Sequence, residues 1–290
     1  MIVYHAMWDL IYMFGQESGM AAHASWYEGW PGYLWQQSIC WTFILLSGYC
    51  MRYSRNPVKR GLIVLACGTA VSVVTTLFMP EAAVRFGVLT FLGCAMIVVG
   101  VVKKLTERNE SEGTGTVTHS DDKGDGSECH HGKLVTFRTV PFVILIFAVL
   151  FFLTRNINAH TFGFEGLVFG RVPEGLYRNM VTAFFGFPPA GFFSTDYFSF
   201  FPWIFLFGVG VSIGAFRGFG GDKGDGSKCH QSESEGTGTL THFLKKTSQC
   251  TRPLDSLCNC LQALGRHSLR IYMLHQVVLY GIFYLIFRAF

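Results

Sequence analysis

The fold is decided by residues Met1 to Gly48, which read MIVYHAMWDLIYMFGQESGMAAHASWYEGWPGYLWQQSICWTFILLSG. Two apolar segments, Met1–Phe14 and Tyr33–Ser54, flank a loop rich in glycine and aromatic residues. His5 and Asp9 are four residues apart in the first segment, so a helix places them on one face. A charged pair inside an apolar helix is costly and therefore marks a candidate functional site. The rest of the chain shows whether these segments lie in a membrane.

The composition is typical of a membrane protein. Of the 290 residues, 50% are hydrophobic and only 14% are charged, whereas about 25% of residues are charged in an average soluble domain. This composition excludes soluble and nucleic-acid-binding classes. Nine cysteines without paired spacing indicate free thiols rather than a disulfide framework.

The apolar segments predict an all-α, polytopic membrane helix bundle of about seven transmembrane helices in a single domain, residues 1–290. The first segment, of 14 residues, would be only ~21 Å long, so we expect the chain to be truncated at its N-terminus. The predicted spans are Met1–Phe14, Tyr33–Ser54, Gly61–Met79, Phe86–Lys103, Phe137–Thr154, Phe198–Phe216 and Leu264–Phe287.

The basic residues predict the orientation of these spans. Of the 23 lysines and arginines, 18 fall on one side and five on the other, and the richer side is cytoplasmic. The N-terminus is then cytoplasmic and the C-terminus extracytoplasmic, in what we expect to be a bacterial plasma membrane. The loop with His23 faces outward, and so does segment 155–197, which we interpret as a lid or as interfacial helices.

Two cytoplasmic loops, 106–134 and 218–252, share low-complexity sequences that favour disorder. DDKGDGSE at Asp121–Glu128 superficially suggests a calcium loop, but Lys123 would occupy a ligand position. Cys129, His130 and His131 with Cys229 and His230 lack the helical framing of a metal site. We therefore predict no metal.

Several polar residues remain as site candidates. Asp9 can orient the His5 imidazole for general base catalysis; the alternative is that the pair acts as a polar clamp between helices. His23 lies alone in an aqueous loop, where a histidine is unremarkable. His275 lies within the last span beside Gln276, while Arg266 and Arg270 lie at its cytoplasmic edge, either binding phosphate or anchoring the helix. Ser47, Gly48, Gly208 and Gly210 favour close helix packing.

Six stretches occur in the order and spacing of one family: YHAMWDL (Tyr4–Leu10), FILLSG (Phe43–Gly48), KRG (Lys59–Gly61), RFGVLTFLG (Arg85–Gly93), DYFSFFPW (Asp196–Trp203) and GRHSLRIYMLHQ (Gly265–Gln276). Together they resemble the catalytic membrane domain of the heparan-alpha-glucosaminide N-acetyltransferase family, above all its small bacterial relatives. The resemblance implies transfer of an acetyl group from cytoplasmic acetyl-CoA to an extracytoplasmic amino sugar or glycan.

The resemblance also bears on the site. His23-Ala24-Ser25-Trp26 matches the context of the family's active histidine, so His23 becomes nearly level with His5 as the catalytic candidate. Asp196 and His275 are secondary polar candidates. The phosphates of acetyl-CoA are expected near Lys59, Arg60, Arg266 or Arg270. The chain departs from the family in beginning after the usual Asp-x-x-Arg-Gly segment and in having Thr90 at a position that is usually histidine.

Two other functions stay open at this point. A transporter or lipid-binding membrane protein would perform no covalent chemistry. A catalytically dead scaffold would retain the fold without the reaction.

Overall fold

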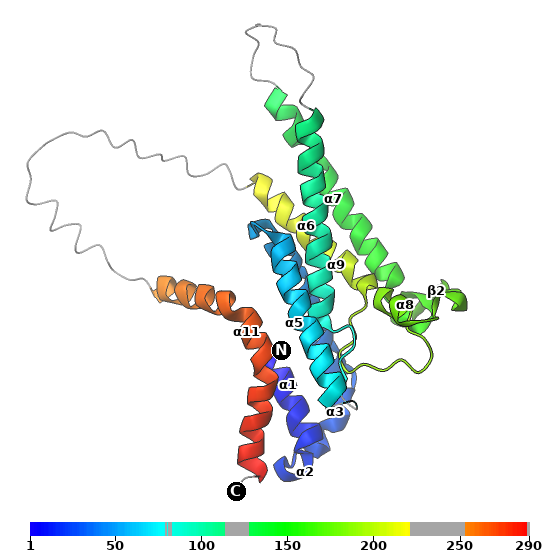
Figure 1. Ribbon diagram of the computed structural model, residues 1–290, viewed down its shortest axis with the longest axis vertical. Coiled ribbons are helices and arrows are strands. Elements are labelled where there is room, and N and C mark those ends of the chain that lie inside the picture. The colour runs from blue at the N-terminus through cyan, green and yellow to red at the C-terminus, as the bar shows by residue number, and fades with distance from the viewer. Residues whose placement is uncertain (79, 81–82, 114–127, 221–252, 289–290) are drawn as a thin grey trace, which may run out of the picture. The chain divides into compact units, whose positions relative to one another are not determined.

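The computed structural model describes residues 1–290 apart from 79, 81–82, 114–127, 221–252 and 289–290. The chain forms two compact units (Figure 1). Unit 1 comprises Met1–Gln37 and Asp225–Phe290, and unit 2 comprises Ser38–Gly224.

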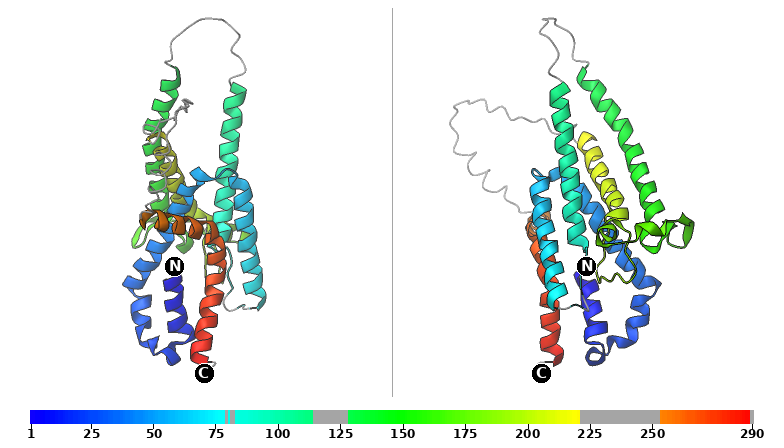
Figure 2. Two further views of the ribbon diagram at one scale, coloured as in Figure 1. Left: turned by 90° about the vertical axis from the view of Figure 1, so that its left-hand side faces the viewer. Right: turned by 45° about the vertical axis from the view of Figure 1, so that its right-hand side comes forward.

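Unit 1 is built from short N-terminal helices and the long C-terminal helix. Its elements are α1 (Ile2–Trp8), the π-helix η1 (Asp9–Met13), α2 (Gly15–Ser18), the 3-10 helix η2 (Met20–His23), α3 (Ala24–Glu28), the beginning of α4 (Trp30–Cys50) and α11 (Pro253–Arg288). The blue α1 runs beside the red C-terminal half of α11 (Figure 2).

The π-helix sets the direction of the side chains that follow Asp9. The Phe14 N–H donates to the Asp9 carbonyl oxygen at 3.0 Å, which is a bond over five residues instead of four. The buried Phe14 ring then lies 5.6 Å from Tyr280, 6.2 Å from Phe283 and 5.9 Å from Phe287, measured between ring centroids. These aromatic contacts hold η1 against α11.

Unit 2 contains the end of α4 and the long helices that follow it. Its further elements are the 3-10 helix η3 (Met51–Tyr53), α5 (Pro57–Phe78), α6 (Val88–Gly113), α7 (Glu128–Thr154), η5 (Ile157–Ala159), β1 (Thr161–Phe164), β2 (Leu167–Arg171), η6 (Glu174–Leu176), α8 (Met180–Phe185) and α9 (Phe200–Gly220). Helix α5 packs along α6, and α7 packs along α9 (Figures 1 and 2).

Glycines bring the backbones of these helices close together. A Cβ atom added at Gly48 of α4 would lie 2.2 Å from the Phe207 carbonyl oxygen of α9, and one added at Gly210 would lie 2.2 Å from the Leu45 carbonyl oxygen. Gly93 of α6 is equally close to α5, since its Cβ would lie 2.6 Å from the Leu65 nitrogen. Close packing through Gly48 and Gly210 is therefore confirmed.

Four described helices are long and apolar enough to cross a membrane: Pro57–Phe78, Val88–Asn109, Thr139–Ala159 and His267–Phe287. They overlap four of the seven predicted spans, and a shorter apolar helix, Phe200–Phe216, overlaps a fifth. The all-α membrane fold is confirmed. The total of seven spans stays a prediction.

The predicted loop 106–134 includes the end of α6, to Gly113, and the beginning of α7, from Glu128. The rest of this loop, and residues 221–252 of the second loop, lie outside the described residues.

Segment 155–197 differs from the expected interfacial helices. Strands β1 and β2 form an antiparallel hairpin that pairs Thr161 with Arg171 and Phe164 with Leu167, with an irregularity after Phe162. Only one short α-helix, the six-residue α8, follows within this segment. Glycines and prolines are frequent here, and they favour turns over continuous helix.

Candidate functional site

Unit 1 brings four polar side chains together between its N-terminal helices and α11. His5 lies in α1, Asp9 begins η1, and His275 and Gln276 lie in α11. Gln276 Nε2 donates a hydrogen bond to Asp9 Oδ1 at 3.1 Å, and the ring centroids of His5 and His275 are 5.0 Å apart. We call these four residues the polar cluster.

The Asp9 carboxylate is the most deeply buried member of the polar cluster, with 1% of its surface exposed. His5 precedes it by one helical turn, and the Asp9 N–H donates to the His5 carbonyl oxygen. Among the described residues, however, the side-chain hydrogen bond of Asp9 goes to Gln276 and not to His5. In this structure the carboxylate therefore orients the Gln276 amide.

The hydrogen bonds of His275 and Gln276 define which of their atoms can accept. His275 Nδ1 lies 2.5 Å from the Tyr272 carbonyl oxygen, and a carbonyl can only accept, so Nδ1 carries a proton and, in the neutral ring, Nε2 has the lone pair. The Gln276 amide nitrogen faces Asp9, which leaves Oε1 as an acceptor.

Three buried atoms of the polar cluster have no hydrogen-bond partner among the described residues: Asp9 Oδ2, His275 Nε2 and Gln276 Oε1. All three are acceptors. Buried acceptors without partners are rare because each costs about 1–3 kcal/mol. A group with several N–H or O–H donors, such as an amine, would satisfy them together.

Aromatic residues flank the polar cluster within unit 1. The Tyr4 ring lies 4.9 Å from Tyr27 and 5.2 Å from Trp35, measured between centroids, and the Tyr27 hydroxyl donates to the Tyr4 carbonyl oxygen at 3.2 Å. The Tyr4 ring also meets His5 edge to face at 6.1 Å. Aromatic rings thus pack against the His5 side of the polar cluster.

His23 lies outside this arrangement. It ends η2, and its side chain is exposed. The described residues show no hydrogen bond or ring contact between His23 and the polar cluster. Trp26 of the same His-Ala-Ser-Trp stretch is 47% exposed and lies 6.3 Å from Trp35. The structure leaves His23 open to solvent.

The basic candidates belong to two different units. Lys59 and Arg60 lie near the beginning of α5 in unit 2, and both are exposed. Arg270 is exposed on α11 in unit 1, whereas the side chain of Arg266 lies outside the described part. Phosphate binding by these residues stays a prediction.

The searched part of the chain holds no group of three or more histidine, cysteine or acidic residues that could bind a metal ion. The side chains of the Cys129 and Cys229 segments lie outside the described residues.

Asp196 has a structural role at the beginning of α6. Its Oδ2 accepts a hydrogen bond at 3.2 Å from the backbone N–H of Val88, the first residue of α6. Burial raises the pKa of this carboxyl, and the hydrogen bond from Val88 partly opposes the rise. Asp196 thus satisfies one of the N–H groups that a helix leaves unpaired at its beginning.

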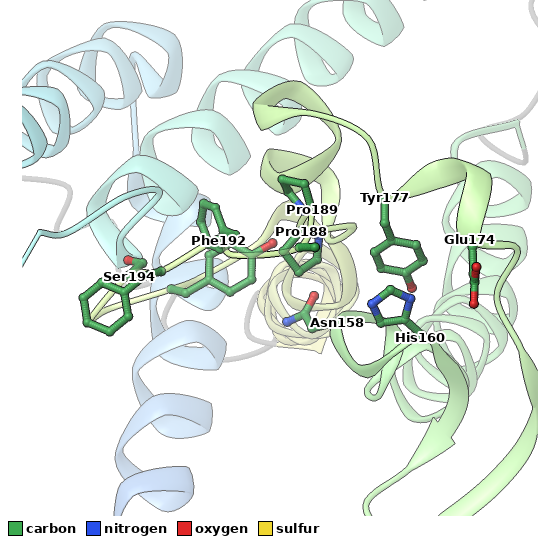
Figure 3. Close-up of a pocket in the computed structure, with 11 residues that line it drawn as sticks. Asn158, His160, Glu174, Tyr177, Pro188, Pro189, Phe192 and Ser194 are labelled. Carbon is green, nitrogen blue, oxygen red and sulfur yellow. The ribbon is translucent and has the colours of Figure 1, made fainter.

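Unit 2 contains a pocket of about 570 Å³ within segment 155–197 (Figure 3). The His160 and Tyr177 rings stack there with centroids 3.7 Å apart, and Asn158 and Glu174 lie at the same pocket. Sequence reasoning missed these residues. The only signal was the frequency of aromatic residues, glycine and proline around Pro188.

Comparison with known proteins gives one match. The family model described as "Heparan-alpha-glucosaminide N-acetyltransferase, catalytic" matches residues 1–111 and 133–224. No curated protein and no solved structure matches the chain. The matched residues include His5, Asp9, His23 and the pocket, whereas His275 and Gln276 lie beyond them.

Proposed function

Because this chain belongs to the heparan-alpha-glucosaminide N-acetyltransferase catalytic family of membrane acetyltransferases, we propose that it transfers an acetyl group from cytoplasmic acetyl-CoA to an extracytoplasmic amino sugar or glycan. The chain is an integral membrane protein, with four described helices that are suited to span a bilayer. We further propose that it resides in a bacterial plasma membrane with its N-terminus in the cytoplasm.

The observation that carries this proposal is the set of three buried acceptors in the polar cluster. An amino group arrives as an ammonium with three N–H donors. Asp9 Oδ2, Gln276 Oε1 and His275 Nε2 supply three acceptors, and the carboxylate also supplies a compensating charge. A site of this kind suits an amine better than a hydroxyl, which has one donor.

Because Nε2 of neutral His275 has a lone pair, we propose that it accepts the first proton. Transfer of one ammonium proton to Nε2 produces the neutral amine, whose nitrogen can then attack the thioester carbonyl carbon of acetyl-CoA. The new C–N bond forms as the carbonyl π electrons move to oxygen. Their return breaks the C–S bond and expels the thiolate.

His5 provides a second base. The nitrogen of the tetrahedral intermediate must lose another proton, and the His5 ring lies 5.0 Å from that of His275. His5 accepts this proton and returns it to the departing thiolate, so the products are an amide, free coenzyme A and one proton released from His275. His23 is the alternative base that the family resemblance favours, and it would act from the end of the 3-10 helix η2, where it is exposed.

We propose that the phosphates of acetyl-CoA bind at the exposed basic residues Lys59, Arg60 or Arg270, or at Arg266. Charge-assisted hydrogen bonds to phosphate favour arginine in particular. Replacement of these residues should raise the KM for acetyl-CoA more than it lowers kcat.

The test is acetyl transfer in membranes that contain the full chain. Membranes are incubated with labelled acetyl-CoA and with glucosamine, N-acetylglucosamine or glucose, and labelled product is counted. We expect glucosamine to be acetylated, and expect His275→Ala and His5→Ala each to lower the rate at least about 100-fold, as loss of a general base does.

His267→Ala is the matched control, because His267 is an exposed histidine on the same helix as His275. It should retain the wild-type rate. If His23→Ala abolishes transfer while His5→Ala and His275→Ala leave it intact, the polar cluster is not the reacting centre. Absence of transfer to every acceptor by the wild-type protein would contradict the acetyltransferase proposal itself.

A further inference from the structure

The pocket of segment 155–197 has the size and the chemical character of a ligand site. Its volume of about 570 Å³ falls within the range of about 300–1,000 Å³ that is usual for small-molecule pockets. Aromatic and proline side chains line it together with a small number of polar groups (Figure 3). This combination is typical of sites that hold an amphipathic ligand in one orientation.

Hydrogen bonds fix the aromatic walls of the pocket. The Tyr177 hydroxyl donates to the Ile157 carbonyl oxygen at 2.5 Å, and the Tyr197 hydroxyl donates to the Ala183 carbonyl oxygen. The His160 ring is stacked on Tyr177 at an interplanar angle of 20°. A ligand therefore meets walls that are already in place, which lowers the entropic cost of binding.

Phe192 and Phe193 supply the apolar surface. Phe192 packs against Tyr197 with centroids 4.9 Å apart and is half-buried, whereas 54% of Phe193 is exposed. The exposed Phe193 ring offers apolar surface to a ligand in the pocket. The C–H face of a pyranose ring has the flat, weakly polar character that packs on such a ring.

Asn158 and Glu174 supply the polar contacts. Asn158 Oδ1 lies 3.2 Å from the Ser199 hydroxyl, whose single proton is shared with the Phe201 carbonyl oxygen, and the Asn158 amide nitrogen is a donor. The Glu174 carboxylate is exposed and forms no ion pair among the described residues. The Arg178 side chain lies close to Gly175, the residue after Glu174, since Arg178 Nη2 would lie 3.3 Å from a Cβ added at Gly175. Glu174 and Asn158 both line the pocket, on opposite sides of the stacked His160 and Tyr177 rings (Figure 3). A carboxylate and an amide match the hydroxyl and ammonium groups of a saccharide.

We propose that this pocket is a saccharide-binding site that takes amino sugars and is separate from the polar cluster. One ring of a saccharide packs on Phe193, ammonium or hydroxyl groups of the saccharide donate to Glu174, and Asn158 donates to a hydroxyl oxygen. The saccharide class rests on the proposed function. The pocket itself consists entirely of unit 2 residues and shares none with the polar cluster.

The test is direct saccharide binding by the purified full chain in detergent, without acetyl-CoA. Saturation-transfer NMR and calorimetry with the disaccharide of glucosamine and with maltose measure binding in the wild-type protein and its variants. Glu174→Gln should weaken binding of the glucosamine disaccharide about tenfold or more, which corresponds to about 1.4 kcal/mol. Its effect on maltose should be smaller. Phe193→Ala should weaken both.

Two further variants make the result specific. Glu165→Gln removes an exposed carboxylate from the turn of the β1–β2 hairpin, outside the pocket, and should bind like the wild type. His275→Ala should retain the binding that depends on Glu174, because its change lies in unit 1. Thermal unfolding confirms that each variant is folded.

The proposal is overturned if the wild-type protein binds neither disaccharide, or if Glu174→Gln and Phe193→Ala bind both as tightly as the wild type. Since no acetyl donor is present, this failure is distinct from a failure of acetyl transfer in membranes.

Discussion

Replacing Gly48 with alanine tests the close contact between α4 and α9. The added Cβ atom would lie 2.2 Å from the Phe207 carbonyl oxygen and 3.2 Å from the Gly210 Cα atom. A contact with backbone cannot be relieved by a rotamer change, so the two helices must separate by about 1 Å to restore an ordinary distance.

That separation has a definite energetic cost. A gap of about 0.5–1 Å removes a quarter to a half of the dispersion energy of each atom pair across the contact. Overpacking in a well-packed core typically costs about 1–3 kcal/mol, against which alanine gains about 0.5–1 kcal/mol over glycine in a helix. We therefore expect Gly48→Ala to lower the free energy of unfolding by about 0–2.5 kcal/mol, and to be less stable than a Gly→Ala change at an uncrowded helix position by about 1–3 kcal/mol.

Unfolding by sodium dodecyl sulfate in bicelles, followed by circular dichroism, measures this difference. Gly281→Ala is the matched control, because it changes a glycine of α11 that has no atom within 4 Å of its added Cβ. It should be neutral or slightly stabilising. The reasoning is refuted if Gly48→Ala is as stable as Gly281→Ala.

Three more predictions follow from single hydrogen bonds. Gln276→Leu leaves both Asp9 carboxylate oxygens without a partner and should lower the free energy of unfolding by about 1–3 kcal/mol, measured in the same detergent titration; unchanged stability would contradict the described contact. Tyr177→Phe removes the hydroxyl that donates to Ile157 and should lower stability by about 0.5–1.5 kcal/mol, with segment 155–197 becoming more sensitive to protease; equal cleavage rates would argue against it. Burial raises the pKa of Asp196 above its ordinary 3.8, so its stabilising contribution is complete below that value and is lost as pH rises through the raised pKa. Asp196→Asn keeps an acceptor for the Val88 N–H. The Tm of this variant should therefore gain on that of the wild type as pH rises from 3.8 through the raised pKa of Asp196, and a constant difference would contradict the shift.

The sequence was sufficient for the membrane fold and for the family. Long apolar segments predict helices directly because a bilayer leaves few alternatives for the backbone. The observed helices Pro57–Phe78 and His267–Phe287 overlap the predicted spans Gly61–Met79 and Leu264–Phe287. The family resemblance, which rested on short stretches such as YHAMWDL, is confirmed by the match over residues 1–111 and 133–224. Close packing at Gly48 was predictable because only a glycine allows such an approach.

The sequence was insufficient for the partner of Asp9. Helical spacing places His5 on the same helix face as Asp9, and this proximity can be predicted from residues that are close in sequence. Gln276 is 267 residues away, and its contact with Asp9 depends on how α11 packs against η1. The orienting effect of Asp9 on His5 stays a prediction, as does a catalytic role for His23.

The pocket escaped prediction for a different reason. Its residues, such as His160 and Tyr177, come together through a hairpin, 3-10 turns and extended backbone, none of which has a strong periodic signal. From its aromatic but polar-interrupted sequence, segment 155–197 is therefore predicted only as a lid or as interfacial helices. Non-periodic segments of this kind require coordinates.

Because of the π-helix η1, a change of chain length by one residue near Leu10 would have large structural consequences. Its fifth-residue hydrogen bond, from Phe14 to Asp9, is what a single inserted codon produces in an α-helix. Deleting one residue between Leu10 and Met13 would restore a continuous α-helix and turn everything after it by about 100°. Phe14 would leave the rings of α11, while His5 and Asp9 would keep their own positions. One codon thus separates this architecture from one in which the first helix carries the same polar residues but lacks its aromatic anchor on α11.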